Sequence, residues 1–320
     1  MTERKSLLIA TRSSELALRQ ARQVQSALAR SGIAAELKTY KTTGDKRLDE
    51  PLSAIGGKGL FTKELEVDLA KGLVDCCVHS LKDLPTELPD RLAIGAVLPR
   101  EDPRDVLIVN AVTGASSIAE LPRGSRVGTS SLRRRAQLMA LRPDVEVVAL
   151  RGNVPTRLRK VDDGQVHAAI LAAAGVHRLG VAQHIACYLD APKWLPAAGQ
   201  GAIAVEIRDD DASMRSLLEE IHDAETWLQV RAERAFLDAL EGGCQVPIGA
   251  LALTHGGVLT LHGLIADVGG RQIVRGDHPI DPENPELTGI RLANELRGRG
   301  ATEILETLRR AEQVPSPQPE

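Results

Sequence analysis

The sequence predicts an α/β protein made of two α/β lobes joined by a hinge, followed by a small α+β C-terminal domain. Three observations lead to this fold class. A chain of 320 residues exceeds what one hydrophobic core usually serves, so two or three domains are expected. Short apolar runs alternate with segments of helical period. Two proline-containing segments, 99–105 and 192–201, predict crossings between the lobes.

The first lobe begins with a strand predicted over residues 6–11. Ser13 or Ser14 caps the helix that follows, and Gly32 ends it. One face of this helix carries Ala17, Ala21, Val24 and Leu28. Further strands are predicted near 35–42, at 74–78 and at 92–97, with a helix over about 62–71.

The second lobe repeats the alternation, with strands at 106–109, 126–128, 145–150 and 168–171 and helices at 132–141 and 154–162. This order predicts parallel sheets flanked by helices, with sites at the carboxyl ends of strands. A helix from about residue 224, strands at 250–253 and 258–265 and a final helix form the third unit, with a disordered tail from about 314. The predicted domains are 1–100 with 200–220, 101–199, and 221–320.

Composition narrows the function classes. A hydrophobic content of 43% with 26% charged residues is ordinary for a globular protein, and 2% aromatic residues disfavour a stacking platform for nucleic acid. The apolar stretch near the N-terminus is too short for a signal peptide or a membrane span, so a cytoplasmic protein is expected. Four cysteines without metal-like spacing argue against disulfides and against zinc; Cys76, Cys77 and Cys187 are expected to pack as small hydrophobes.

The fourth cysteine, Cys244, lies in the loop EGGCQVPIG. Glycines before the sulfur and a proline and a glycine after it forbid regular structure and predict an exposed turn. The loop alone leaves two readings equally open, a reactive thiol and a merely tolerated one.

Basic residues gather in one segment of this slightly acidic chain: residues 123–160 contain ten Lys and Arg against two acids. Polar and basic side chains follow three predicted strands: Arg12 with Ser14; Thr129, Ser130 and Ser131 with Arg133 and Arg134; and Arg151 with Arg157. Hydroxyls, helix N-termini and arginines together predict anion sites for carboxylates or phosphates. The alternative is a capped helix with a solvated basic face.

Asp83 follows the predicted strand at 74–78 in the turn HSLKDLP. It can form an ion pair with Lys82 or cap the turn. It can also accept hydrogen bonds from ligand N–H groups and stabilise a developing cation.

An ordered set of motifs spans nearly the whole chain: IATR at 9–12, GKGLF at 57–61, HSLKD at 79–83, REDPRD at 100–105, GTSSLRR at 128–134, LRGN at 150–153, LPAAGQG at 195–201 and EGGC at 241–244. Together they closely resemble the porphobilinogen deaminase (hydroxymethylbilane synthase) family. Each motif alone is weak, whereas the set in this order is highly specific.

The resemblance implies two lobes like those of type II periplasmic binding proteins and a third domain that presents Cys244. It implies a cytoplasmic, monomeric transferase that condenses four porphobilinogen molecules into hydroxymethylbilane with release of ammonia, and passes its product to uroporphyrinogen III synthase. Neither nucleic acid nor a membrane is an expected partner, and no metal is implied. A dipyrromethane cofactor is expected on Cys244 through a thioether.

The resemblance also assigns roles to residues. Asp83 matches the carboxylate that holds pyrrole N–H groups and stabilises the azafulvenium cation left by ammonia. Lys58 and Phe61 match a mobile loop. The substrate and cofactor carboxylates are expected to meet Arg12, Ser14, Lys82, Thr129, Ser130, Ser131, Arg133, Arg134, Arg151, Arg157, Arg178 and Gln200.

Two residues depart from the family pattern. Ala54 stands where some members carry a lysine, which weakens the case for a basic mobile loop. Pro155 replaces a glycine or a polar residue, but proline suits a first helical turn and leaves Arg157 in place.

Two other function classes remain open at this point. A two-lobed anion-binding protein without catalysis would explain the hinge and the basic sites, but it needs no exposed thiol. A cysteine hydrolase would explain Cys244, but it needs a histidine base, and none of the eight histidines lies in a compelling partner motif.

Overall fold

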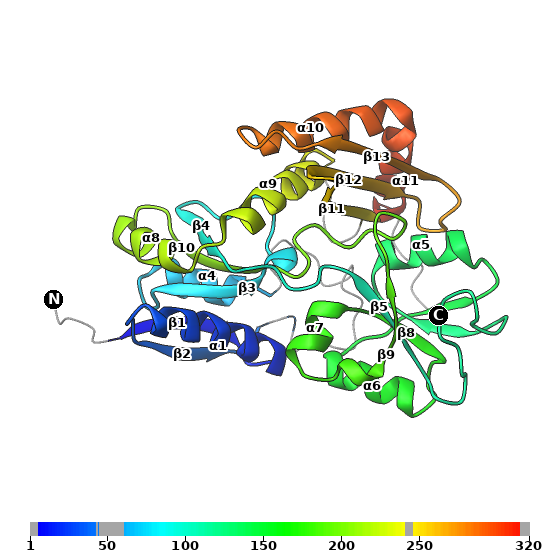
Figure 1. The fold of residues 1–320 in the computed structure, drawn as a ribbon, viewed down its shortest axis with the longest axis horizontal. Helices are drawn as coiled ribbons and strands as arrows, with labels where there is room; N and C mark the ends of the chain where they lie inside the picture. Colours follow the sequence, from blue (N-terminus) through cyan, green and yellow to red (C-terminus); the bar gives the residue numbers. More distant parts are fainter. Residues whose placement is uncertain (1–5, 43, 45–60, 241–245, 314–320) are drawn as a thin grey trace.

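The computed structural model describes residues 6–42, 44, 61–240 and 246–313, and these residues form three β-sheets. Two five-stranded sheets lie side by side in Figure 1, and the third, three-stranded sheet lies above them with the C-terminal helices. The predicted α/β fold with two lobes and a small C-terminal domain is confirmed. The exact domain boundaries remain a prediction.

The first sheet has the strand order β2-β1-β3-β10-β4. Its strands are β1 (Leu7–Arg12), β2 (Ala35–Tyr40), β3 (Cys76–Ser80), β4 (Leu92–Val97) and β10 (Ile203–Arg208). Its helices are α1 (Glu15–Arg30), α4 (Lys63–Ala70) and α8 (Ala212–Leu218), with the short 3₁₀ turns η1 (Leu81–Asp83) and η3 (Glu219–Ile221).

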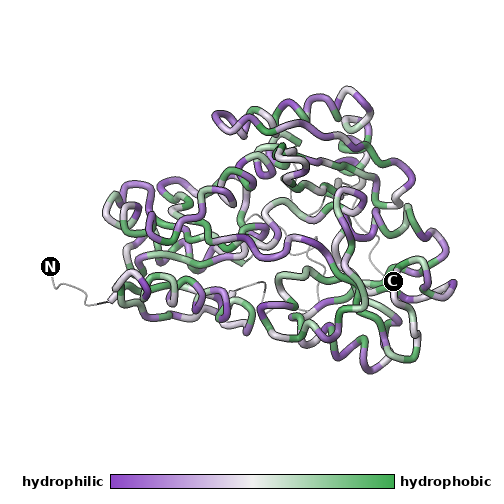
Figure 2. Tube along the Cα trace, viewed as in Figure 1, coloured by the Kyte–Doolittle hydropathy of each residue, from purple (hydrophilic) through white to green (hydrophobic). Residues whose placement is uncertain are grey.

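Helix α1 forms as its sequence predicts. The Ser14 hydroxyl accepts a hydrogen bond from the backbone N–H of Ala17 at the N-cap, and the predicted apolar face is buried. Gly32 adopts a φ of 77° just beyond the helix, a conformation that glycine reaches without steric penalty. Figure 2 shows the same patterning along the chain, with hydrophilic and hydrophobic residues alternating along the outer helices.

The second sheet has the order β7-β6-β8-β5-β9. Its strands are β5 (Asp105–Val109), β6 (Arg126–Gly128), β7 (Glu146–Val148), β8 (Ala168–Ala172) and β9 (Ile185–Leu189). Its helices are α5 (Leu132–Leu141), α6 (Val154–Asp162) and α7 (Ala173–Arg178), with the 3₁₀ turn η2 (Ala182–His184).

The prediction of parallel sheets is wrong for one strand in each sheet. In the first sheet β10 runs antiparallel to β3 and β4, and in the second β5 runs antiparallel to β8 and β9. Each of these central strands is the first to follow a long connection from the other sheet, over residues 98–104 or 190–202. It therefore does not enter its sheet through the helical crossover that makes neighbouring strands parallel.

The C-terminal unit consists of α9 (Ala224–Ala239), β11 (Ile248–His255), β12 (Val258–Ala266), β13 (Ile273–Pro279), α10 (Pro285–Leu296) and α11 (Thr302–Gln313), with a bend at Arg297–Ala301 between the last two helices. The sequence analysis missed β13, whose side chains are at most half-buried. Phe236 of α9, Leu261 of β12 and Leu292 of α10 lie in the fully buried core of this unit.

A single carboxylate ties this unit to both connections between the lobes. Glu233 of α9 is fully buried and accepts two hydrogen bonds from the guanidinium of Arg100, at 2.7 and 2.9 Å. It also accepts backbone N–H bonds from Gly199 and from Ala252. Arg100 lies in the first connection and Gly199 in the second, so α9 holds the two connections together. In the described part of the chain, no helix is long and apolar enough to span a bilayer.

Candidate active site

Asp83 lies where β3 ends, in the 3₁₀ turn η1, and its side chain is exposed. Among the described residues its carboxylate makes neither an ion pair with Lys82 nor a turn-capping hydrogen bond. It borders a cavity of about 20 Å³ together with Arg12, Gln20, Phe61 and Ser80. A carboxylate in this position is accessible to the N–H groups of a ligand.

Lys82, beside Asp83, turns toward the connection between the lobes. Its ammonium donates a hydrogen bond to the side-chain oxygen of Gln200 at 3.3 Å. Burial lowers the pKa of Lys82 to about 8, against the opposing effect of the nearby Asp83 charge. Lys82 therefore titrates near neutral pH.

Arg133 and Arg134 do not form the solvated basic face that was the alternative interpretation. They open helix α5, and only 5% and 6% of their surfaces are exposed. Nη1 of Arg133 lies 2.8 Å from one oxygen of Asp105, and Nη2 of Arg134 lies 2.7 Å from the other. The two arginines thus share one buried carboxylate.

Asp105, the first residue of β5, is the centre of this buried group. It also accepts hydrogen bonds from the indole N–H of Trp194 at 2.9 Å and from the amide of Gln200 at 2.8 Å. Burial alone would raise the pKa of Asp105, but the charges of Arg133 and Arg134 outweigh it and hold that pKa well below its usual range. Asp105 is therefore ionised at neutral pH, and its hydrogen bonds link both connections to helix α5.

The hydroxyl groups predicted to bind an anion are engaged locally. Ser131 caps α5, and its hydroxyl accepts from the N–H of Arg134. Thr129 accepts from the N–H of Ser131, and Ser130 donates to the carbonyl of Leu150. These contacts shape the loop between β6 and α5.

Two arginine N–H groups in this lobe are buried without a hydrogen-bond partner among the described residues, namely Nε of Arg134 and Nη1 of Arg151. Nε of Arg157 donates to the carbonyl of Gly152 at 2.8 Å. Burial, together with repulsion from Arg134 and Arg151, lowers the pKa of Arg157 to about 10, while Asp83 acts in the opposite direction. Asp83 from the first lobe and three arginines from the second therefore lie within electrostatic reach of one another.

Arg12 and Phe61 meet in the first lobe, where the guanidinium of Arg12 lies 4.2 Å from the centroid of the Phe61 ring. Arg178 lies elsewhere. It donates to the carbonyl of Gly201 at 2.7 Å and lines a larger cavity of about 900 Å³ with Arg22 and Glu101. Its expected place among the carboxylate-binding arginines stays a prediction. Cys244, Lys58 and Ala54 lie outside the described residues.

The residues that sequence reasoning missed are the buried acids. The sequence analysis assigned no role to Asp105 or Glu233. Asp105 pairs with two arginines of the site, and Glu233 pairs with Arg100 in the first connection. The sequence did contain one sign of the role of Asp105: it begins the apolar strand DVLIV, where a buried carboxylate without a partner would be unfavourable.

The fold and the site together define a two-lobed α/β protein that holds a buried, net positive cluster opposite an exposed carboxylate. Residues 7–216 match the family model "Porphobilinogen deaminase, dipyromethane cofactor binding domain", and residues 227–298 match "Porphobilinogen deaminase, C-terminal domain". The chain belongs to the porphobilinogen deaminase family, as its motifs indicate.

Curated relatives agree with this assignment. The chain is 49% identical over 313 residues to porphobilinogen deaminase of Syntrophobacter fumaroxidans, covering 97% of this chain and 100% of the relative. It is 50% identical over 303 residues to that of Syntrophomonas wolfei, covering 94% and 98%. The methionine-binding protein MetQ is a more distant solved structure, with 15% identity, a TM-score of 0.44, and coverage of 70% of this chain and 92% of that one.

Proposed function

We propose that this protein is a hydroxymethylbilane synthase, which condenses four porphobilinogen molecules head to tail on a dipyrromethane cofactor attached to Cys244. Ammonia is released at each condensation, and hydrolysis then frees hydroxymethylbilane. The observation that carries the proposal is the pairing of an exposed acid, Asp83, with a buried excess of positive charge in the second lobe.

The charge excess follows from counting the buried group. Arg133 and Arg134 carry two positive charges, and Asp105 supplies one negative charge. A buried charge without a counter-ion is unfavourable, so this group favours an anionic ligand. The acetate and propionate groups of porphobilinogen are anions of this kind.

The described residues also fit the dipyrromethane cofactor. Nε of Arg134 and Nη1 of Arg151 are buried and have no hydrogen-bond partner in the part of the chain that the structure describes, and carboxylates are the acceptors that arginine pairs with most strongly. When bound, the cofactor would supply the terminal pyrrole carbon to which new pyrroles are added. Arg134, Arg151 and Arg157 would hold its carboxylates.

The other residues of the site have distinct tasks in this proposal. Asp83 accepts hydrogen bonds from pyrrole N–H groups and stabilises positive charge that develops as ammonia leaves. Lys82, held by Gln200 and titrating near pH 8, places a further positive charge beside the substrate carboxylates. Arg12, held against Phe61, faces the same small cavity as Asp83.

We further propose that the protein is a cytoplasmic monomer and that uroporphyrinogen III synthase consumes its product. These statements rest on the family. Size-exclusion chromatography with light scattering measures the first directly, and dimers at micromolar concentration would contradict it.

Intact-mass analysis tests attachment of the cofactor. The denatured wild-type protein should exceed its sequence mass by one dipyrromethane, and Cys244→Ser should not. Cys187→Ser, at a partly buried cysteine in the second lobe, is the matched control and should retain the added mass. Active protein with an unmodified mass would refute the proposed attachment.

Asp83→Ala tests the catalytic role. We expect the fold to be intact and product formation to fall by at least about 100-fold, the usual effect of removing a group that stabilises transition-state charge. Asp90→Ala removes another exposed acid from the same region and should leave the rate nearly unchanged. Near-normal turnover by Asp83→Ala would exclude the role proposed here.

A further inference from the structure

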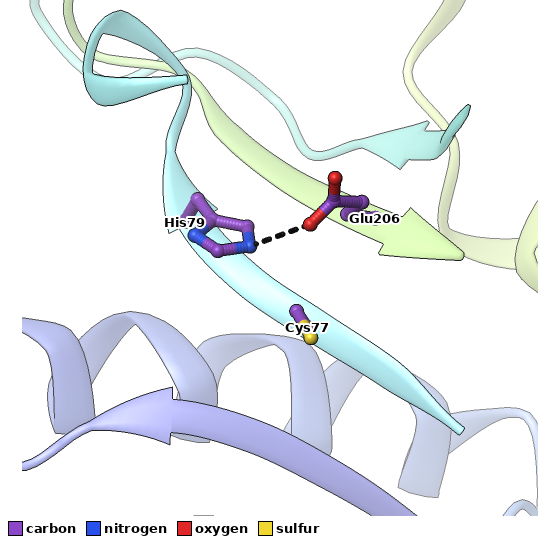
Figure 3. A group of neighbouring side chains, drawn as sticks. All are labelled: Cys77, His79 and Glu206. Atoms are coloured by element: carbon purple, nitrogen blue, oxygen red, sulfur yellow. Dashed lines mark hydrogen bonds and ion pairs between the residues drawn. The ribbon is translucent and has the colours of Figure 1, made fainter. Parts of the chain in front are cut away.

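A second group of chemically active side chains lies within the first lobe. Cys77 and His79 alternate along β3, so both point to the same face of the sheet, and Glu206 stands opposite Cys77 on the neighbouring strand β10. All three side chains are buried. Figure 3 shows the hydrogen bond between the His79 imidazole and the Glu206 carboxylate, with Cys77 two residues earlier on β3. Nε2 of His79 lies 3.0 Å from the carboxylate oxygen.

The carboxylates around this group are incompletely satisfied. Oε1 of Glu206 and Oε1 of Glu66 are buried, and neither has a hydrogen-bond partner among the described residues. The charged groups that act on Glu66 are Glu206, His79 and Glu64, of which His79 alone can be positive. A cation here would satisfy carboxylate oxygens that have no partner among the residues the structure describes.

The three donor atoms are a thiol sulfur, an imidazole nitrogen and a carboxylate oxygen, and each lies within 4.8 Å of the others. In a tetrahedral zinc site, with bonds of about 2.0–2.3 Å, neighbouring ligand atoms lie about 3.5 Å apart. Metal binding therefore requires the most distant donor atoms to approach each other by about 1 Å. The Cys77 sulfur would exchange its 3.5 Å contact with the carbonyl of Leu65 for a metal bond.

We propose that Cys77, His79 and Glu206 bind one Zn²⁺ ion, with Glu66 as a neighbouring carboxylate. Mixed sulfur, nitrogen and oxygen donors suit zinc, whereas magnesium and calcium prefer oxygen alone. Binding displaces two protons: the proton of the Cys77 thiol leaves to solvent as the sulfur–metal bond forms, and the proton in the His79–Glu206 hydrogen bond leaves Nε2 while Nδ1 of the same imidazole takes one up, so that Nε2 can bind the ion. Two negative ligands, the thiolate and the Glu206 carboxylate, then balance the charge of the ion.

The proposed zinc site can be reached from the small cavity of the first lobe, and it links two neighbouring strands. His79 borders the small cavity that also contains Asp83 and Arg12, so an ion can reach the imidazole from that side. The ligands join β3 to β10, and helix α4, which carries Glu66, packs on the same strands. β3 leads directly into the turn of Asp83, so the ion would stabilise the strand that positions this residue.

The sequence argued against zinc because the cysteines lack the usual spacing, and the structure shows why that criterion missed this group. Two ligands alternate on one strand, and the third follows 127 residues later. Only the antiparallel pairing of β3 with β10 brings them together.

The test uses the complete protein, treated with a chelator and dialysed. Zn²⁺ binding is measured by titration calorimetry, and Co²⁺ is used as a spectroscopic probe. We expect one ion per chain, a near-ultraviolet band from thiolate bound to Co²⁺, visible bands of tetrahedral Co²⁺, and a higher melting temperature with Zn²⁺.

Cys77→Ser should remove the thiolate band and weaken Zn²⁺ binding by at least about 100-fold. Cys76→Ser is the matched control, because Cys76 is equally buried but points to the opposite face of β3, and it should retain both signals. If Cys77→Ser does not fold, Glu66→Gln provides the second variant and should weaken binding with the thiolate band retained. The absence of saturable binding by the wild type, or a Co²⁺ spectrum unchanged in Cys77→Ser, would overturn the proposal.

Discussion

Replacement of Asp105 by asparagine perturbs the centre of the buried cluster while keeping its shape. The carboxylate accepts four hydrogen bonds, at 2.8 Å from Arg133, 2.7 Å from Arg134, 2.9 Å from Trp194 and 2.8 Å from Gln200. Asparagine removes the negative charge and replaces one acceptor oxygen by an NH₂ group, which then faces either the donors of Arg133 and Trp194 or those of Arg134 and Gln200. Two buried guanidiniums are then left without a counter-charge, which costs about 3–5 kcal/mol.

The size of this loss can be read from urea unfolding. With a denaturant slope of about 3 kcal/mol/M, a loss of about 3–5 kcal/mol lowers the midpoint by about 1–1.7 M. The chain has two tryptophans, and one of them, Trp194, bonds to Asp105 itself, so tryptophan fluorescence reports on the affected region. A total stability of about 5–15 kcal/mol is typical, so the variant should still fold in the absence of urea but should be measurably less stable than the wild type.

The matched control is Asp190→Asn. Asp190 forms an ion pair of 2.8 Å with Arg104, but 74% of its side chain is exposed. Exposed pairs contribute about 0–1 kcal/mol, so this variant should shift the midpoint little. If Asp105→Asn shifts the midpoint by no more than Asp190→Asn does, the central role of Asp105 is incorrect.

The effect of Asp105 should also depend on pH in a defined direction. Its pKa in the folded protein is held below that of the unfolded chain, which is about 3.9. The unfolded state therefore binds a proton first as the pH falls. The stability difference between wild type and Asp105→Asn should be complete above about pH 4 and should shrink progressively below it.

Three further predictions concern the connections and the active-site turn. Glu233→Gln removes the buried partner of Arg100 and should lower the free energy of unfolding, measured with denaturant, by about 3–5 kcal/mol. The control is Glu286→Gln, in a half-exposed pair with Arg231, which should lower it by about 1 kcal/mol or less. Gly201→Ala places a Cβ against the carbonyl oxygen of Glu101 at a φ of 91°, so its melting temperature should fall well below that of Gly32→Ala, where the left-handed conformation alone costs about 1–2 kcal/mol. Equal melting temperatures of the two variants would contradict the close packing at Gly201. The pKa of Lys82 falls from 10.5 to about 8 on folding, so the unfolded state binds more protons between these two pH values. The free energy of unfolding of the wild type should therefore rise relative to that of Lys82→Met from pH 8 to 10.5. Parallel curves of unfolding free energy against pH for the two proteins would show that Lys82 is not buried as described.

Much of the fold could be predicted because local signals agreed with it. Helices α5, α6 and α9 begin at the predicted residues because each follows an N-cap residue: Ser131, Asn153 or Asp223. The side chain of each cap accepts a hydrogen bond from the backbone N–H of the residue three positions later. Strand direction could not be predicted in the same way. β5 and β10 are apolar runs like any other, and only the path of the connections decides that they run antiparallel.

The same distinction between local and long-range information applies to the candidate site. The sequence located the arginines and Asp83 at strand ends, because side chains at that edge of a sheet meet in space. It did not give their partners. Arg133 and Arg134 lie 28 and 29 residues from Asp105, and Arg100 lies 133 residues from Glu233.

These long-range partners change the meaning of the basic segment at 123–160. Its excess of positive charge predicted a strong anion site, but Arg142 pairs with Asp144, and Arg133 and Arg134 share Asp105. Three of its ten basic residues therefore pair with acids of the protein itself. Among the described residues, Arg151 and Arg157 form no ion pair, and Nε of Arg134 and Nη1 of Arg151 have no hydrogen-bond partner. These groups, with the single uncompensated charge of the Asp105 group, are available to a ligand. Carboxylate binding should consequently depend far more on Arg151 than on Arg142, although both belong to the same basic run.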